Sequence, residues 1–149
     1  MQRVYSLLVD NNSGVLSRIS GLFTRRGYNI DSITAGVTAD SRFTRITIVS
    51  SGDEIILSQI EKQIAKLEDV IVVKVLKPEE SVYRELILVK IRANAQQRSE
   101  IVSIADIFRA KIVDAERESL VIELTGTQSK LEAFLQLLDG YEILELDRT

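Results

Sequence analysis

VDNNSGVLSRISGLFTRRGYNIDS, residues 9–32, is the stretch that decides the fold. It starts at the end of an apolar run and passes through the polar loop Asp10–Gly14. Apolar residues then recur at the period of one α-helical face, and these are Val15, Leu16, Ile19, Leu22 and Phe23. Gly27 tolerates the left-handed backbone that ends a helix. The stretch therefore predicts a strand, a tight loop, an amphipathic helix to about Arg26 and the start of a second strand.

The segments around this stretch complete one structural unit. Val4–Val9 is rich in aromatic and branched residues and predicts the first strand. Ile30–Thr38 and Phe43–Ser50 alternate apolar and polar residues, which predicts a hairpin. Asp53–Leu67 follows the helical period, and Val70–Leu76 is a β-branched strand. The predicted order is β-α-β-β-α-β, which is the ferredoxin-like arrangement.

The pattern then repeats after a short linker. The only proline of the chain, Pro78, lies among charged residues, so residues 78–83 are predicted to be a linker. The second unit is predicted to contain strand Glu85–Arg92, helix Ser99–Arg109, hairpin strands Lys111–Glu116 and Leu120–Leu124, a helix that Thr127 caps and Gly140 ends, and strand Tyr141–Leu146. The predicted fold class is α+β, with ferredoxin-like units at residues 1–77 and 84–149.

The size of the units predicts an oligomer. A unit of about 75 residues buries only about 60% of its unfolded surface and is marginal alone. An open four-stranded sheet also leaves two edges that must be covered or paired. Pairing of edges between chains would satisfy both needs.

Composition narrows the function classes. Among 149 residues, 45% are hydrophobic and 28% charged, and the net charge is -3, with no long basic run for nucleic acid. No apolar run reaches the ~20 residues that span a bilayer. The start MQRVYSLLV has no signal-peptide layout, so we expect a cytoplasmic protein.

Cysteine and histidine are both missing from the chain. This removes disulfides, thiolate nucleophiles, zinc sites of the Cys/His type and the usual general base near neutral pH. No phosphate-binding glycine loop or metal-ligand spacing occurs either. We therefore predict no catalytic site and no metal site.

Two polar loops contain the candidate binding residues. Asn12 or Ser13 is expected to cap the helix, which is the simpler interpretation of the loop. The alternative is an anion site, because free N–H groups at a helix start attract a carboxylate and Gly14 lets a ligand approach the backbone. Asn29 is either a turn residue or an amide that pairs with both the ammonium and the carboxylate of an amino acid.

Two further alternatives concern macromolecular partners. Arg25 and Arg26 form either a solvated helix end or a contact with an acidic protein surface. A ferredoxin-like sheet that binds nucleic acid needs exposed aromatic residues to stack on bases. Aromatic residues make up only 5% of this acidic chain, which does not favour that function.

Four segments of the chain carry a family resemblance. They are DNNSGVLSRI at 10–19, GLFTRRGYNIDSITAGVT at 21–38, SRFTRITIV at 41–49 and YRELILVKI at 83–91. Together they resemble the small regulatory subunits of acetolactate synthase, in order and over nearly the whole chain. Ser13 stands where that family usually has proline. The resemblance implies that the first unit is an ACT domain, a module that senses amino acids.

The resemblance also implies a function without chemistry in this chain. Such a subunit binds and activates a large catalytic subunit that uses thiamine diphosphate, Mg²⁺ and FAD, and needs no cofactor itself. It confers feedback inhibition by a branched-chain amino acid, usually valine, in branched-chain amino acid biosynthesis. The alternative is an ACT-domain sensor that regulates a different biosynthetic enzyme.

The implied effector site lies between two chains. ACT domains of this type form a homodimer side by side, with an eight-stranded sheet and the effector at the interface. By motif position, the effector is expected to contact Asn11, Gly14, Val15 and Leu16 of one chain and Asn29 and Ile30 of the other.

Overall fold

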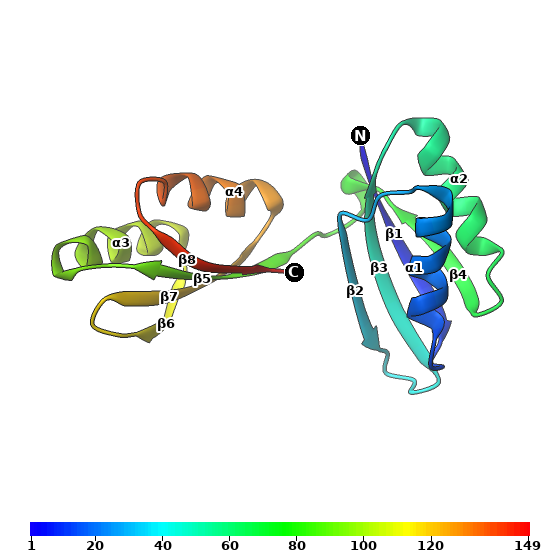
Figure 1. The fold of residues 1–149 in the computed structure, drawn as a ribbon, viewed down its shortest axis with the longest axis horizontal. Coiled ribbons are helices and arrows are strands. Elements are labelled where there is room, and N and C mark those ends of the chain that lie inside the picture. Colours follow the sequence, from blue (N-terminus) through cyan, green and yellow to red (C-terminus); the bar gives the residue numbers. More distant parts are fainter. The chain divides into compact units, whose positions relative to one another are not determined.

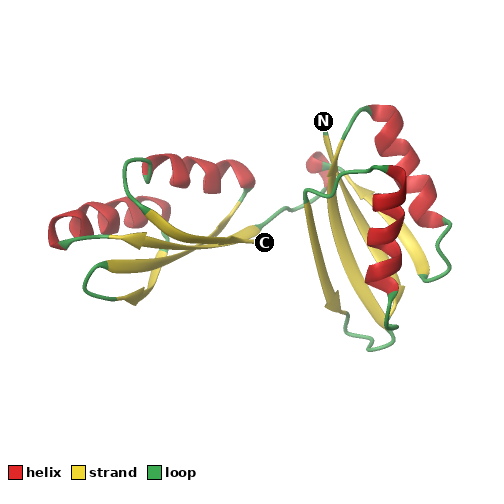
Figure 2. Cartoon of the chain, in the orientation of Figure 1, coloured by secondary structure: helices red, strands yellow, loops and turns green.

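The computed structural model describes residues 1–149 and divides the chain into two compact units, Met1–Ser81 and Val82–Thr149. Each unit is a four-stranded antiparallel sheet with two helices on one face (Figures 1 and 2). The predicted fold class of two ferredoxin-like β-α-β-β-α-β units is thereby confirmed. The longest helix has 14 residues, and no helix is long and apolar enough to cross a membrane.

The first unit has all six predicted elements. They are β1 (Gln2–Asp10), α1 (Val15–Arg26), β2 (Ser32–Val37), β3 (Phe43–Ser51), α2 (Glu54–Ala65) and β4 (Val70–Leu76). The strand order is β2-β3-β1-β4, so β2 and β4 are the two edges. Register pairs Leu7 of β1 with Ile46 of β3 and Val73 of β4, which sets the core face of the sheet.

The second unit repeats this topology after a short 3₁₀ helix, η1 (Pro78–Glu80). Its elements are β5 (Glu85–Arg92), α3 (Ala95–Phe108), β6 (Lys111–Ala115), β7 (Ser119–Gly126), α4 (Gln128–Leu137) and β8 (Ile143–Arg148). The strand order β6-β7-β5-β8 matches that of the first unit. Val89 of β5 pairs with Ile122 of β7, as Leu7 pairs with Ile46 in the first unit.

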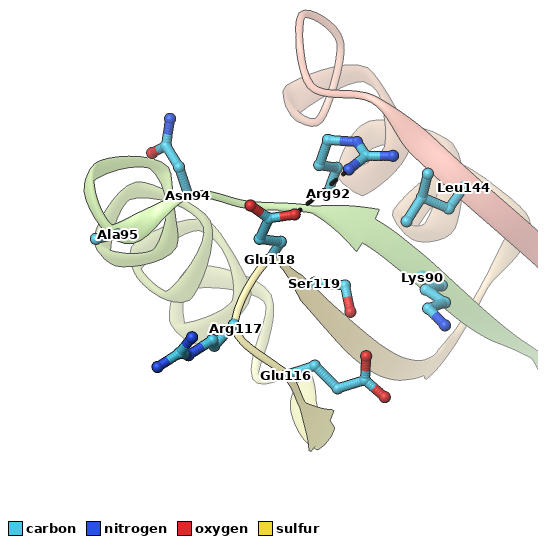
Figure 3. A pocket seen from close by; sticks show the side chains of 9 residues that line it. All are labelled: Lys90, Arg92, Asn94, Ala95, Glu116, Arg117, Glu118, Ser119 and Leu144. Carbon is cyan, nitrogen blue, oxygen red and sulfur yellow. Dashed lines mark ion pairs between the residues drawn. The ribbon is translucent and has the colours of Figure 1, made fainter.

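The helix-free face of the second sheet is hollowed beside the β6–β7 turn (Figure 3). The hollow measures about 720 Å³ and is lined by Lys90, Arg92, Asn94, Ala95, Glu116, Arg117, Glu118, Ser119 and Leu144. Charges of both signs line it, and Arg92 pairs there with Glu118 at 3.9 Å. It is an open, polar depression of the surface.

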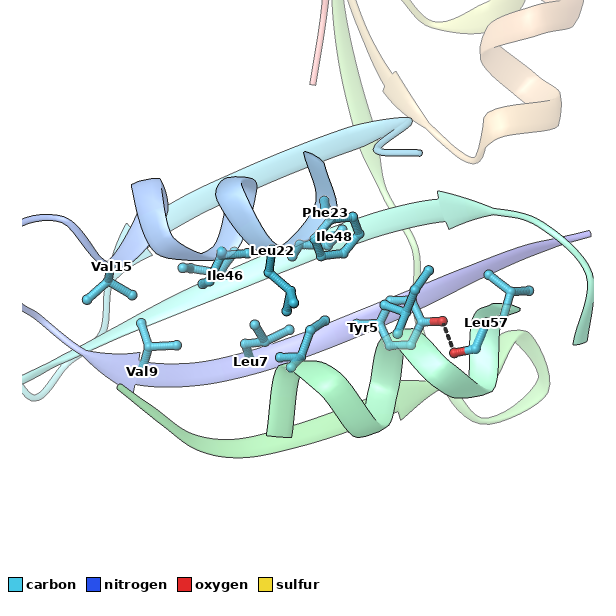
Figure 4. Close-up of a cluster of buried hydrophobic side chains, with 12 residues drawn as sticks. Tyr5, Leu7, Val9, Val15, Leu22, Phe23, Ile46, Ile48 and Leu57 are labelled. Atoms are coloured by element: carbon cyan, nitrogen blue, oxygen red, sulfur yellow. Dashed lines mark hydrogen bonds between the residues drawn. The ribbon is translucent and has the colours of Figure 1, made fainter. Parts of the chain in front are cut away.

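Each unit has its own hydrophobic core between sheet and helices (Figure 4 shows the first). Tyr5, Leu7 and Val9 of β1 meet the buried face of α1 and α2, because alternate strand residues point to the helix side. The hydroxyl of Tyr5 donates a hydrogen bond to the Leu57 carbonyl at 2.7 Å, so this buried polar group is satisfied.

The ends of all four helices differ from the prediction, and α2 ends at Ala65 instead of Leu67. Neither Asn12 nor Ser13 caps α1, because the N-cap is Gly14 with a left-handed backbone. α3 begins four residues before Ser99, because Asn94 and Gln97 form a capping box there. α4 ends at Leu137, three residues before Gly140. The predicted caps Gly27 of α1 and Thr127 of α4 are confirmed.

Candidate functional site

The start of α1 is an uncapped helix terminus. Gly14 has φ +85° and no side chain bonds to the first-turn N–H groups. The first turn also contains no acidic residue. A helix start of this kind leaves donors and the positive end of the helix dipole available to an anion.

Asn11 holds the loop in place from the other side. Its backbone N–H donates to the Arg42 carbonyl at 2.8 Å, and its side-chain amide donates to the Ser41 carbonyl at 3.0 Å. The Thr44 hydroxyl donates to the Asn11 Oδ1 at 3.1 Å. Asn11 therefore ties the β1–α1 loop to the β2–β3 turn, where the Arg42 side chain lowers the pKa of Asp40.

The next two predicted residues have opposite environments. The Val15 side chain is buried in the core, so only its backbone can meet a ligand. The Leu16 side chain is 48% exposed and gives the loop an apolar wall. The loop thus combines backbone donors with a short apolar surface.

Asn29 and Ile30 lie at the opposite end of α1. The Asn29 amide is exposed and donates to the Asp31 carboxylate, and its carbonyl accepts a hydrogen bond from the Ser50 hydroxyl. Ile30 is half-buried against the core of the first unit. α1 has 12 residues, so about 18 Å separates this group from the Gly14 loop. One chain therefore brings Asn11, Gly14, Val15 and Leu16 together, but not with Asn29 and Ile30.

The β1–α1 loop, the start of α1 and the residues bonded to them form one corner of the first unit. Arg18 and Asp69 also belong to this corner, although the sequence analysis did not single them out. Arg18 Nε donates to Asp69 Oδ2 at 2.5 Å, and this hydrogen bond raises the pKa of Arg18. The Asp69 carbonyl also accepts from the Asp10 N–H at 2.9 Å. Arg18 follows Gly14 by four residues, a spacing that places it on the same helix face as the loop.

In the corresponding corner of the second unit, side chains cap the helix start. The Asn94 side chain accepts from the Gln97 N–H, and the Gln97 side chain accepts from the Asn94 N–H. The start of α3 therefore does not duplicate the uncapped terminus of α1, and the hollow beside it contains the Arg92–Glu118 ion pair. No group of three or more acidic, His or Cys side chains could hold a metal ion.

The fold defines the class, a protein of two ferredoxin-like units, and the first unit has an uncapped helix start. A family model described as "AHAS small subunit-like ACT domain" matches residues 5–72, where AHAS is acetohydroxyacid synthase. A second model, "Small subunit of acetolactate synthase", matches residues 84–149. The chain belongs to the acetolactate synthase small-subunit family.

Individual relatives agree over nearly the full length. A probable acetolactate synthase small subunit of Methanothermobacter thermautotrophicus is 47% identical, over 98% of this chain and 88% of the relative. The acetolactate synthase isozyme 3 small subunit of Escherichia coli is 45% identical, over 100% of this chain and 92% of the relative. The crystal structure of the small subunit from Thermotoga maritima is similar with a TM-score of 0.91 and 41% identity, over 100% of this chain and 93% of that one.

These relatives confirm the resemblance inferred from the sequence. They are small subunits of acetolactate synthase, which are regulatory, and the catalytic subunit is a separate chain. The individual site residues are not tested by the relatives and stay predictions.

Proposed function

We propose that this chain binds and activates the thiamine-diphosphate-dependent large subunit of acetolactate synthase and makes it sensitive to feedback by valine. The observation that carries the sensor part is the uncapped start of α1 at Gly14. Thiamine diphosphate, Mg²⁺ and FAD belong to the catalytic partner in this proposal. The cytoplasmic location stays a prediction.

The two loops supply what an aliphatic amino acid needs. The N–H groups at the start of α1 suit its carboxylate, because they lack a side-chain acceptor. The oxygen of an asparagine amide, such as that of Asn29, suits its ammonium group. Leu16 and Ile30 offer apolar surface to its side chain. Together these groups favour a branched-chain amino acid over a charged one.

The strand order explains how a dimer would assemble these groups. β2 is an edge strand, and all of its residues except the half-buried Ser32 are exposed. The Asn11 loop bonds to the turn after β2, whereas Asn29 precedes the start of β2. Antiparallel pairing of two β2 edges about a two-fold axis sets the start of one strand beside the end of the other. Asn29 of the partner subunit would then lie beside the Asn11–Leu16 loop.

Pairing through β2 also links ligand binding to dimer geometry. An effector that contacts both chains stabilises the dimer arrangement in which both contacts are made. The catalytic subunit can respond only if its affinity or activity differs between the dimer arrangements. The proposed site therefore gives the regulator a means to transmit binding.

Calorimetric titration of L-valine into the full chain tests the site. Gly14→Asp places a carboxylate at the helix start, and Asn29→Ala removes the proposed ammonium partner. We expect each change to weaken binding by at least about tenfold, because the new carboxylate repels that of the ligand and the loss of the amide removes a charge-assisted contact. Asn12→Ala is the control, since no hydrogen bond of its side chain holds the loop, and it should bind as the unchanged chain does. Unaltered affinity in both site variants would place the effector elsewhere.

Mixing the two site variants tests whether the site is shared. In a mixed dimer, the intact loop of the Asn29→Ala chain faces the intact Asn29 of the Gly14→Asp chain. One site per mixed dimer is then complete, so mixing should restore binding that neither variant has alone. A site within one chain would gain nothing from mixing.

Activity of the reconstituted enzyme tests the partner. The chain should raise acetolactate formation by the large subunit and should make it sensitive to valine. Gly14→Asp should keep the activation and lose the sensitivity. Absence of any activation would refute the regulatory proposal.

A further inference from the structure

Arg18 lies at the uncapped start of α1 with most of its donors unused. Its Nη1 atom is 3.0 Å from the position that a Cβ atom would take on Gly14. Side chains of a helix lean toward its N-terminus, so Arg18 covers the turn that Gly14 opens. Only Nε has a hydrogen-bond partner, the Asp69 carboxylate at 2.5 Å. The two Nη groups of the guanidinium remain available.

A cation at this place is unfavourable without an anion. The positive end of the helix dipole and the guanidinium repel each other, and α1 has no acidic residue in its first turn. Asp69 supplies one negative charge, which bonds to the Nε atom of Arg18. By contrast, α2 begins with Asp53 as its cap and Glu54 in its first turn. The start of α1 therefore presents backbone N–H groups and the two Nη groups of Arg18 without an acceptor from the chain, while Asp69 pairs with Nε alone.

The second unit contains a natural comparison. Arg98 follows the N-cap Asn94 by four residues, as Arg18 follows Gly14. Its Nη2 donates to the Arg117 carbonyl at 2.9 Å and also to the Glu116 carbonyl. Arg98 thus stabilises the β6–β7 turn through these hydrogen bonds. The same residue type at the matching place has one Nη group bonded in the second unit and neither Nη group bonded in the first.

We propose that Arg18 binds the carboxylate of the amino-acid effector through its Nη groups, and that Asp69 positions the guanidinium for this contact. The inference rests on the proposed sensor function and adds a charged partner to the backbone donors. An arginine fork matches the two oxygens of a carboxylate. Because Asp69 fixes Nε, less rotamer freedom is lost when the ligand binds. Selection for a free carboxylate follows from this arrangement.

A comparison of L-valine with L-valinamide tests the proposal in the full chain, alone and with the large subunit. Arg18→Gln should raise the Kd of L-valine about 10- to 100-fold, because it removes charge-assisted hydrogen bonds. It should change the Kd of L-valinamide, which has no carboxylate, by less than about threefold. Arg98→Gln is the matched control and should alter neither Kd. Asp69→Asn should weaken L-valine binding less than Arg18→Gln does.

A second variant decides the case in which L-valinamide binds too weakly to measure. Arg18→Lys keeps the positive charge and should recover part of the L-valine affinity. Equal affinity for L-valine in Arg18→Gln and the unchanged chain would overturn the inference and leave the sensor function standing. Equal loss for both ligands, or no recovery by Arg18→Lys, would overturn it in favour of a purely structural ion pair. An unchanged chain that binds no amino acid even with the large subunit would instead refute the sensor function itself.

Discussion

The two units differ most where the first strand of each meets its helix. The backbone N–H groups of Asn11 and Ala93 donate to the carbonyls of Arg42 and Glu118, both at 2.8 Å, so these positions correspond. Four residues, 11–14, then lead to α1, but only two residues, 93–94, lead to α3. The longer loop ends in Gly14, which has no side chain to cap the helix, and the shorter loop ends in Asn94, whose side chain caps the helix. One fold thus presents an open helix start in one unit and a closed one in the other.

The acidic residue beside each corner shows the same divergence. Asp69 and Glu142 correspond, because their carbonyls accept from the N–H groups of Asp10 and Arg92. The Asp69 carboxylate reaches the helix and bonds to Arg18. The Glu142 carboxylate instead bonds to Arg92 Nε at 2.8 Å. Corresponding backbone positions therefore serve the helix start in one unit and the strand end in the other.

The largest expected effects test whether the two units are independent. Ile46 and Ile122 occupy corresponding core positions and are 2% and 0% exposed. Replacement of either by alanine should lower the free energy of unfolding by about 2–5 kcal/mol, because it removes buried methyl groups and leaves a cavity. Hydrogen exchange should show lost protection only in the altered unit. Loss of protection in both units from one change would show that they unfold as one cooperative body.

A pH-dependent effect should separate the two cores. Burial raises the pKa of Tyr5 from its ordinary value of 10 to about 12. The folded state thus holds this proton more tightly than the unfolded chain does, so stability is present below pH 10 and is lost as the pH rises through about 12. Ile87 of the second unit lies at the corresponding position and has no proton to lose.

Alkaline unfolding of the Tyr5→Phe variant checks this expectation. At neutral pH the variant should lose about 1 kcal/mol, because the hydrogen bond to Leu57 is removed. Between pH 10 and 12 the first unit of the variant should lose less stability than that of the unchanged chain. Tyr28→Phe, whose hydroxyl bond lies at the surface, is the control. Parallel curves for Tyr5→Phe and the unchanged chain would contradict the expectation.

The capping difference predicts a smaller effect. Asn94→Ala should lower the free energy of unfolding of the second unit by about 1 kcal/mol, because it removes the cap of α3. Ser13→Ala should change the first unit by less than about 0.5 kcal/mol, since no side chain caps α1. Urea unfolding followed by hydrogen exchange measures both changes. Equal losses would mean that the Ser13 side chain stabilises the start of α1 as much as Asn94 stabilises the start of α3.

The spacing of hydrophobic residues along the chain was enough to predict the fold. The alternation in β3 and the helical spacing of Ile19, Leu22 and Phe23 led directly to the observed elements and core. The errors fell at the starts and ends of helices, where one hydrogen bond decides the boundary. Asn94 was missed because the weakly apolar run Ala95–Arg98 gave no helical period, and the capping box acts through Gln97 instead.

The candidate site was less accessible to sequence reasoning. Asn11, Gly14 and Asn29 were predicted from the polar loops around the first helix and from the family resemblance, and they stay predictions. Arg18 and Asp69 are 51 residues apart, and no local pattern reveals that Arg18 bonds to Asp69. The turn between α2 and β4 brings Asp69 to the end of β1 through a backbone hydrogen bond, which only the sheet topology sets.

The smallest expected effect concerns the stiffness of the open loop. Ser13 donates no hydrogen bond through its backbone N–H and does not have a positive φ. Ser13→Pro should therefore raise the free energy of unfolding of the first unit by about 0.5 kcal/mol, because it restricts the unfolded chain. It should also tighten L-valine binding about twofold, since less loop entropy is lost on binding. Asn12→Pro is the matched control and should destabilise, because the Asn12 N–H donates to the Asp10 carbonyl at 2.9 Å. A Ser13→Pro variant that unfolds more readily would show that the uncapped start of α1 depends on a flexible loop. The start of α3, which follows a shorter loop and has a side-chain cap, needs no such flexibility.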